Sequence, residues 1–188
     1  MKTVWIVLGV IVLGVLMLGG SLMSSRNELV TDREAYKAAY QQVDVDLQRR
    51  LDLIPNLVET VKGFAKQEQG VINSVTQARA AMMGARTPSD RIAANNQLDG
   101  ALGRLFVMVE AYPDLKSNEN FMRLQDELSG TENRIAVSRR RYNDSVQKYN
   151  TSIDLFPKNI AASLFGFQRE NAYFSAEAAA KQAPKVTF

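Results

Sequence analysis

Residues 4–23 read VWIVLGVIVLGVLMLGGSLM, an apolar run that contains no charged side chain. About 20 apolar residues, each rising about 1.5 Å along a helix, cover a hydrocarbon core of about 30 Å, so the run is long enough to cross a bilayer. A cleaved secretory signal is the alternative, because Lys2 gives a positive start. A signal core usually holds only about 7–15 apolar residues before an Ala-x-Ala pattern, which is missing here. We interpret residues 1–25 as a membrane anchor with its span at about 4–23.

The charges beside this run say little about its orientation. Lys2 and the amino terminus lie on the short side, and Arg26, Arg33 and Lys37 lie on the other side among acidic residues. Because Lys and Arg favour the cytoplasmic side, the count leans slightly towards a cytoplasmic domain. The absence of cysteine fits either compartment. The side of the membrane therefore stays open.

The rest of the chain predicts an all-α fold. Glycine is sparse, prolines are widely spaced, and no alternation of apolar and polar residues lasts long enough to indicate a sheet. We expect an N-terminal transmembrane helix followed by an elongated antiparallel bundle of about four long helices over residues 26–157. A short helix and an aromatic segment should occupy 158–175, and 176–188 should form a mobile tail.

Prolines mark the expected helix boundaries. Pro55 should break the first helix, because an interior proline loses an amide donor, and a second helix should start there and carry an apolar stripe to Met82. The first helix has no proline or glycine between residues 21 and 53, so it can continue directly out of the membrane span. Glu68 occupies one position of the second stripe, which requires either a wet gap or a cationic partner.

The third helix has a readable start and end. Thr87 can cap it, Pro88 fits its first position, and Asp90 can reach back to the cap amide. Pro113 should end it. Gly100 and Gly103 lower helix propensity, from which we expect another helix to pack closely there.

Residues 118–156 carry the most regular pattern. Large residues recur at seven-residue intervals, and the companion row is mostly small hydroxyls, which would let a neighbouring helix approach closely. After Pro157, Asn159 can cap a short helix that Gly166 ends, and the remainder should pack poorly. The first row is Phe121, Leu128, Ile135, Tyr142, Tyr149 and Phe156, and the second is Leu124, Thr131, Ser138, Ser145 and Ser152.

The composition limits the chemistry. The chain has no histidine and no cysteine, which removes zinc sites and histidine- or cysteine-based catalysis, and no phosphate-binding glycine loop is present. A net charge of +3, spread along the chain, does not indicate nucleic-acid binding. We therefore predict no cofactor, no metal and no enzyme activity. The carboxylates that could perform acid-base work, but to which we assign structural or solvated roles, are Asp44, Asp46, Asp52, Glu59, Glu110 and Asp114.

Two groups of residues form a candidate interaction surface. The first is basic, and consecutive arginines at 100° per residue cannot all face one partner, so ion pairs with neighbouring helices are the simpler interpretation. The second is aromatic and fits a membrane interface, another copy of the chain, or packing against the bundle end. The basic residues are Arg49, Arg50, Arg139, Arg140 and Arg141, and the aromatic ones are Phe165, Phe167 and Phe174.

Several strings resemble the LemA family. They are DLIPNLVETVK at 52–62, EAYPDLK at 110–116 and RYND at 141–144, with NF at 120–121, TENRI at 131–135 and FP at 156–157 in the same order. The resemblance implies a single-pass bacterial membrane protein with a long helical bundle and no established catalytic residues. It also implies membrane proteases as possible companions.

We hypothesise a scaffold or adaptor of the bacterial cytoplasmic (inner) membrane that acts by self-association and protein binding. Its partners would be the lipid bilayer, further copies of itself as a homo-oligomer, and other envelope proteins. The alternative is a membrane-remodelling or stress-response component that polymerises on the bilayer.

Overall fold

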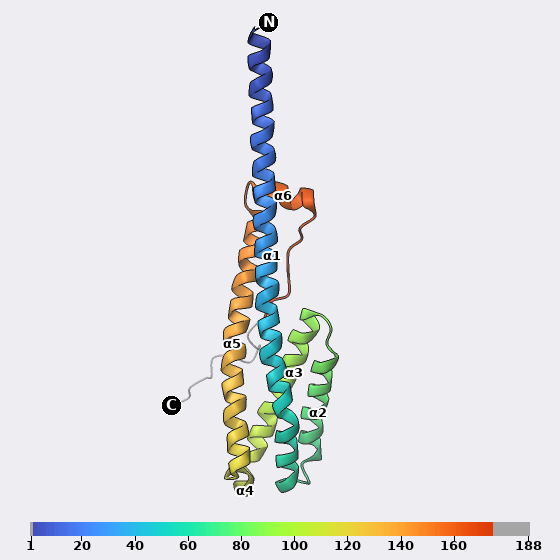
Figure 1. The fold of residues 1–188 in the computed structure, drawn as a ribbon. Coiled ribbons are helices and arrows are strands. Elements are labelled where there is room, and N and C mark those ends of the chain that lie inside the picture. Colours follow the sequence, from blue (N-terminus) through green and yellow to red (C-terminus); the bar gives the residue numbers. More distant parts are fainter. Residues whose placement is uncertain (1, 175–188) are drawn as a thin grey trace, which may run out of the picture. The chain divides into compact units, whose positions relative to one another are not determined.

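The computed structural model describes residues 2–174 and is all-α, as the sequence predicts (Figure 1). These residues form six helices and contain no strand. The predicted tail at 176–188 lies outside the described residues. The helices are α1 (Lys2–Phe64), α2 (Gln69–Gly84), α3 (Pro88–Val109), α4 (Pro113–Lys116), α5 (Glu119–Asp154) and α6 (Lys158–Phe165).

The contacts of the chain divide it into two compact units. Of the described residues, unit 1 contains 2–41 and 141–171, and unit 2 contains 42–140 and 172–174. Helices α1 and α5 each contribute a segment to both units. Each unit is therefore built from segments that are distant in the sequence.

Helix α1 is 63 residues long, and the predicted break at Pro55 is wrong. Pro55 lies inside the helix, where its missing N–H leaves the carbonyl of Leu51 without its regular partner. The Nε of Arg79, on α2, donates a 3.1 Å hydrogen bond to that carbonyl oxygen. The turn comes instead at residues 65–68, where the half-buried Glu68 accepts a 2.8 Å hydrogen bond from the hydroxyl of Tyr112.

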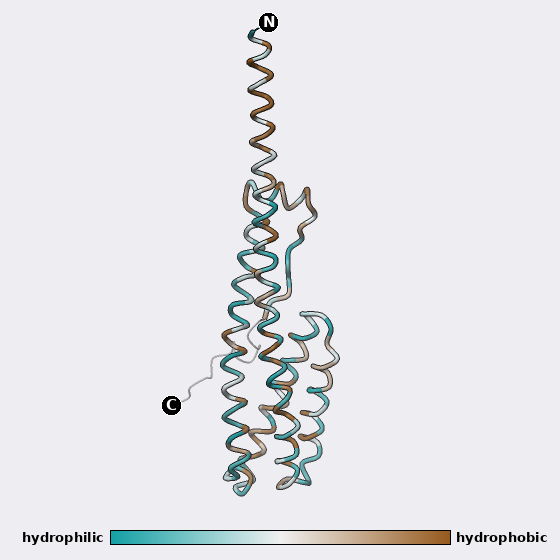
Figure 2. The backbone as a smooth tube through the Cα atoms, in the orientation of Figure 1, coloured by the Kyte–Doolittle hydropathy of each residue, from teal (hydrophilic) through white to brown (hydrophobic). Residues whose placement is uncertain are grey.

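The first part of α1 carries the apolar run. Its side chains at residues 4–18 are almost all exposed, and the run is the longest hydrophobic stretch of the tube in Figure 2. Among the described residues, α1 is the one helix long and apolar enough to cross a membrane. It continues without a break beyond the run, as the absence of proline and glycine between 21 and 53 suggests.

Unit 1 packs α1 against α5 and α6. A small core joins Leu29 of α1 to Ala161 and Ala162 of α6, and Leu22, Ile153 and Phe167 pack against it. Further along, the rings of Tyr36 and Tyr149 lie 5.0 Å apart, and those of Tyr40 and Tyr142 lie 5.6 Å apart. Aromatic pairs thus hold α1 and α5 together in this unit.

Unit 2 is a bundle of the second part of α1, helices α2 to α4, and the first part of α5. The capping box of α3 is confirmed, because Thr87 accepts from the amide of Asp90 at 3.1 Å and Asp90 accepts from the amide of Thr87 at 3.3 Å. Apolar side chains from each long helix fill the core. The buried ones include Leu47, Leu51, Ile54, Leu57, Val61, Ile72, Val75, Met82, Leu98, Leu102, Leu105, Phe121, Leu128 and Ile135.

The two rows of α5 are largely buried, as predicted. Phe156 is the exception at 78% exposed, because α5 ends at Asp154. The buried hydroxyls bond locally: Thr131 donates to the carbonyl of Leu128 at 2.7 Å, and Ser138 to that of Arg134 at 3.0 Å. Small hydroxyl residues can therefore line a helix interface without leaving polar atoms unpaired.

The expectation of close helix packing at the α3 glycines is wrong. A Cβ at Gly103 would meet nothing within 4 Å, and one at Gly100 would meet only the end of Arg104 at 4.0 Å. Both glycines are exposed. No neighbouring helix therefore requires a glycine at either position.

The carboxyl-terminal part of unit 1 is better ordered than the sequence indicates. The N-cap of α6 is Pro157, so Asn159 is not the cap, while Gly166 ends the helix with a φ of 72° as predicted. The segment after it packs on α5, where the Asn150 amide donates to the carbonyl of Glu170 at 2.7 Å and accepts from its amide at 2.9 Å. The Tyr149 hydroxyl donates to the carbonyl of Gln168 at 3.0 Å.

Candidate functional site

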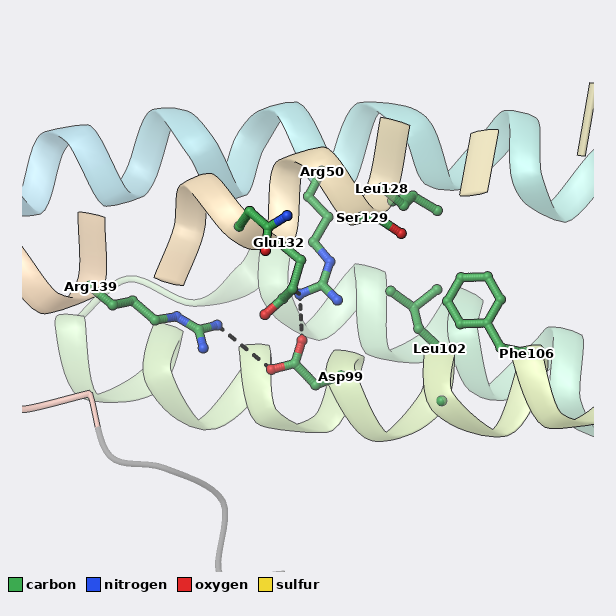
Figure 3. A pocket seen from close by; sticks show the side chains of 10 residues that line it. Arg50, Asp99, Leu102, Phe106, Leu128, Ser129, Glu132 and Arg139 are labelled. Carbon is green, nitrogen blue, oxygen red and sulfur yellow. Dashed lines mark hydrogen bonds and ion pairs between the residues drawn. The ribbon is translucent and has the colours of Figure 1, made fainter. Parts of the chain in front are cut away.

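A hollow of about 610 Å³ opens on the surface of unit 2 (Figure 3). Three helices line it, with Arg50 on α1, Asp99 and Phe106 on α3, and Glu132 and Arg139 on α5. The charged side chains gather at one end, and the apolar ones lie towards the other. The apolar residues are Leu102, Phe106 and Leu128.

Arg50 is the centre of the charged end. Its side chain is 8% exposed, and its Nη1 donates to Asp99 in a short hydrogen bond and lies 3.0 Å from Glu132 Oε2. Arg139 Nη2 lies 3.6 Å from Asp99 Oδ2, which also accepts from the Asn95 amide at 2.7 Å. A buried guanidinium is tolerated when carboxylates pair with it, so two arginines and two acids balance one another here.

Some polar atoms of this network have no hydrogen-bond partner among the described residues. They are the Nε of Arg50, the Nε and Nη2 of Arg139, the Oδ1 of Asn95 and the Oε2 of Glu132. Buried donors without acceptors are uncommon in folded proteins. Since both arginines line the hollow, an oxygen acceptor on a bound group would satisfy them.

Arg139 has one more neighbour within unit 2. Its guanidinium lies 5.3 Å from the ring centroid of Phe174, which is buried. A cation over an aromatic face is attracted by the ring quadrupole. The carboxyl-terminal segment thus restrains the charged end of the hollow.

The predicted interaction residues have different surroundings within their units. Arg50 and Arg139 come together at Asp99, whereas Arg49, Arg140 and Arg141 are exposed. In unit 1, Phe165 lies under Arg26 at 5.5 Å and Phe167 lies under Arg33 at 5.3 Å. The four prolines predicted to break helices occupy different positions. Pro88 and Pro113 begin helices, Pro157 is an N-cap, and Pro55 lies inside α1.

Sequence reasoning missed Asp99, Glu132 and Asn95. Asn95 was detectable, because it stands three residues before Leu98 on the buried stripe of α3 and four residues before Asp99. A fully buried amide on an apolar stripe indicates a polar network. Nothing in the local sequence of Asp99 or Glu132 identifies Arg50 as their partner.

The candidate carboxylates are dispersed over the structure. Asp44 pairs with Arg91, Asp46 and Asp52 accept from glutamines one turn earlier, and the others lie on exposed faces. Among the described residues, no three acidic side chains gather in a way that could hold a metal ion. Two of the exposed acids, Glu59 and Glu110, pair with Lys62 and Lys116, and Asp114 lies in the first turn of α4.

A buried carboxylate, that of Asp32, lies in unit 1. Asp32 accepts a 2.8 Å hydrogen bond from the Ser152 hydroxyl, and Lys148 Nζ lies 2.8 Å away. Burial works against ionisation of Asp32, but the bonds from Lys148 and Ser152 outweigh it and hold the pKa of the carboxyl below its ordinary value. Burial also raises the pKa of Tyr149 and of Tyr36.

Comparison with known proteins gives one family match. A model described as the LemA family matches residues 39–188. Magnetosome protein MamQ 2 of Paramagnetospirillum magneticum is 29% identical over 94% of this chain and 74% of its own length. Magnetosome protein MamQ of Magnetospirillum gryphiswaldense is 28% identical over 88% and 71%. Protein LemA of Metamycoplasma hominis is 25% identical over 73% and 63%.

Proposed function

This chain belongs to the LemA family, and from that premise we propose that it is a membrane-anchored adaptor or scaffold that acts by binding. The span would cross the bacterial cytoplasmic membrane once. The hollow of unit 2 would receive a segment of a protein partner, either a second copy of the chain or another envelope protein such as a membrane protease.

The observation that carries this proposal is the continuity of α1. The helix begins with an exposed apolar run, continues to Arg50 in unit 2, and passes through Pro55 to its end at Phe64. Exposed apolar side chains over a whole span length are costly in water and favourable in lipid. A protein bound at the hollow would therefore be tethered to the bilayer.

The hollow suits a peptide segment better than a catalytic reaction. Its apolar end can bury an aliphatic or aromatic side chain, and the free N–H groups of the arginines can bond a backbone carbonyl or a carboxylate. Both acids at the site, Asp99 and Glu132, already pair with Arg50. Acid-base work would require one of them to leave its ion pair.

Photocrosslinking in living cells tests the binding role. A photoreactive phenylalanine analogue replaces Phe106, which lines the hollow, and in a matched variant it replaces Phe64, which is exposed elsewhere in unit 2. We expect a discrete crosslinked product from position 106 and none from 64. A product of twice the chain mass indicates a second copy, and another mass indicates a different protein. Absence of any product from 106, or equal products from both positions, would refute the proposal.

Alkaline washing of membranes tests the anchor separately. The full chain should stay with the lipid, and a variant that lacks residues 1–25 should be released. Retention of the shortened variant would contradict the role of the apolar run.

Membrane remodelling by polymerisation is a second candidate. The observation that favours it is the group of exposed apolar side chains on and before α6, next to the end of the apolar run. Full-length protein that remains monomeric in vesicles and leaves their shape unchanged would exclude it.

A further inference from the structure

An exposed apolar face lies on the carboxyl-terminal part of unit 1. Ile160 and Leu164 stand one turn apart on α6, and Leu164 is 65% exposed. The two residues before Pro157 are also exposed and apolar. We call these side chains the α6 apolar patch, which comprises Leu155, Phe156, Ile160, Leu164 and Phe165.

The opposite face of α6 is fixed to α1 where the apolar run ends. Ala161 and Ala162 are buried against Leu29, and Leu22, in the last turn of the run, packs against the same cluster. Figure 1 shows α6 beside α1 in this part of unit 1. The patch is therefore held at the end of the predicted span.

The helix rise gives the depth of this contact. Leu29 lies about 9 Å beyond Met23 along α1 at about 1.5 Å per residue. The headgroup layer of a bilayer is about 5–8 Å thick on each side of the hydrocarbon core. The cluster that contains Ala161 and Ala162 therefore extends from the edge of the hydrocarbon core at Leu22 to the outer limit of the headgroup layer at Leu29, so α6 lies beside the headgroups.

The side chains around α6 are of the types that are favourable at the boundary between lipid and water. The Arg26 guanidinium lies over the Phe165 ring at 5.5 Å, and Lys158 lies 2.7 Å from Glu28. Arginine, lysine and aromatic rings are favourable where one side of a residue meets lipid and the other meets water. Trp5, at the other end of the run, lies about 30 Å from Arg26 along the helix, close to one hydrocarbon thickness.

We propose that the α6 apolar patch rests on the interface of the same bilayer that the span crosses, with its side chains inserted at the headgroup boundary. The occupant of this face is lipid, because α6 is fixed at headgroup depth and both Arg26 and Lys158 lie beside it. The contact gives the protein a second attachment, which limits rotation and tilt of unit 1 on the membrane. It rests on the proposed anchoring by residues 4–23.

The absence of cysteine from the chain makes a direct test possible. Single variants Leu164→Cys, Val12→Cys and Val137→Cys of the full chain carry a nitroxide label in vesicles of phosphatidylethanolamine and phosphatidylglycerol. Collision with oxygen reports lipid exposure, and collision with a water-soluble nickel chelate reports water. Val12 lies in the run, and the exposed Val137 of unit 2 is the control.

We expect the label at position 12 to be deep in lipid and the label at 137 to be in water. The label at 164 should show a nickel collision rate lower than that at 137 by about threefold or more, with an oxygen rate typical of the headgroup region. If 164 matches 137 while 12 is deep, the α6 inference fails and the anchor stands. If 12 is itself in water, the proposed function fails.

A second copy of the chain is the competing occupant of the patch. In that case the label at 164 would be shielded from both reagents, and its spectrum would broaden through coupling between two nitroxides. That result would overturn the lipid contact. A label at Ile160 repeats the measurement on the same face and guards against disturbance of the helix by one substitution.

Discussion

Arg79 Nε donates a 3.1 Å hydrogen bond to the carbonyl oxygen of Leu51. In a regular helix this carbonyl accepts from the amide of residue 55, but residue 55 is proline. A side chain of α2 therefore supplies the donor that the backbone of α1 lacks. This contact replaces the backbone hydrogen bond that Pro55 removes from α1. It also joins α2 to α1 at that position.

Replacing Arg79 should show how much an unpaired Leu51 carbonyl lowers the stability of the protein. We expect Arg79→Met to lower the free energy of unfolding by about 1–2 kcal/mol, as loss of a charge-assisted hydrogen bond does. In a Pro55→Ala background the loss should be smaller, because the new amide bonds to Leu51. Urea unfolding of the four proteins, followed by circular dichroism, gives the double-mutant cycle. Equal losses in both backgrounds would show that Arg79 does not act through Leu51.

Arg50 and Arg49 are neighbours with opposite environments. Arg50 is buried between Asp99 and Glu132, and Arg49 is exposed. Arg50→Met leaves Glu132 without its cation and Asp99 with Arg139 alone, and should destabilise unit 2 by about 3–5 kcal/mol. Arg49→Met should change the free energy of unfolding by less than about 0.5 kcal/mol. Urea midpoints provide the comparison, and similar small effects at both positions would mean that the network is not structural.

The depressed pKa of Asp32 predicts an acid-sensitive contribution to stability. The unfolded chain should protonate Asp32 near the ordinary aspartate pKa of 3.8, and the folded chain should do so only at lower pH. The contribution is therefore complete above about pH 4 and is lost as the pH falls through the lower folded value. Unfolding midpoints between about pH 2 and 6 should fall less steeply in Asp32→Asn than in the unaltered protein.

The exposed Asp126 offers a matched control for this measurement. Asp126→Asn should retain the pH dependence of the unaltered protein. Identical dependence of the unfolding midpoint on pH in Asp32→Asn and Asp126→Asn would show that the contact of Asp32 with Lys148 and Ser152 does not cause the acid sensitivity.

These cases show which parts of the structure local sequence predicts. The capping box of Thr87 and Asp90 depends on neighbouring residues, as does the left-handed end at Gly166, so both were predicted correctly. The continuity of α1 at Pro55 depends on Arg79, which is 28 residues from Leu51. Propensity alone does not locate such a donor, because the packing of α2 on α1 brings it there.

The candidate site was predicted only in part for the same reason. The arginines at 50 and 139 were recognised as a basic group, but their meeting point Asp99 is 49 residues from Arg50 in the chain. The hollow is lined by side chains from three helices, and periodicity describes each helix separately. The two hydrogen bonds between the Asn150 side chain and the backbone of Glu170 were not predicted, because an asparagine in a helix is usually solvated.

Two glycines should respond in opposite directions to alanine. Gly166 has a φ of 72°, which strains any L side chain, so Gly166→Ala should destabilise unit 1 by about 1–2 kcal/mol. Gly100 is helical and its added Cβ would meet only the end of Arg104 at 4.0 Å, so Gly100→Ala should stabilise by about 0.5–1 kcal/mol. Thermal unfolding should separate the two variants. Destabilisation by Gly100→Ala would indicate a packing constraint on α3 that the structure does not contain.

Filling the hollow should block binding without unfolding the protein. Asn133 is exposed on α5 and lines the hollow, whereas Asn120 is exposed on the same helix and does not. A tryptophan at position 133 would occupy space that a partner side chain needs, so Asn133→Trp should reduce the photocrosslink from position 106 by about tenfold, equivalent to about 1.4 kcal/mol of binding.

Asn120→Trp carries the same change of size and polarity and should leave the crosslink unchanged. Both variants should keep the helical circular dichroism and the alkali resistance of the membrane-bound protein, because neither side chain is buried in the core. If both substitutions reduce the crosslink equally, the partner binds through some other surface of unit 2. If neither does, the partner contacts Phe106 without entering the hollow, and the arginine donors at its charged end have no part in recognition.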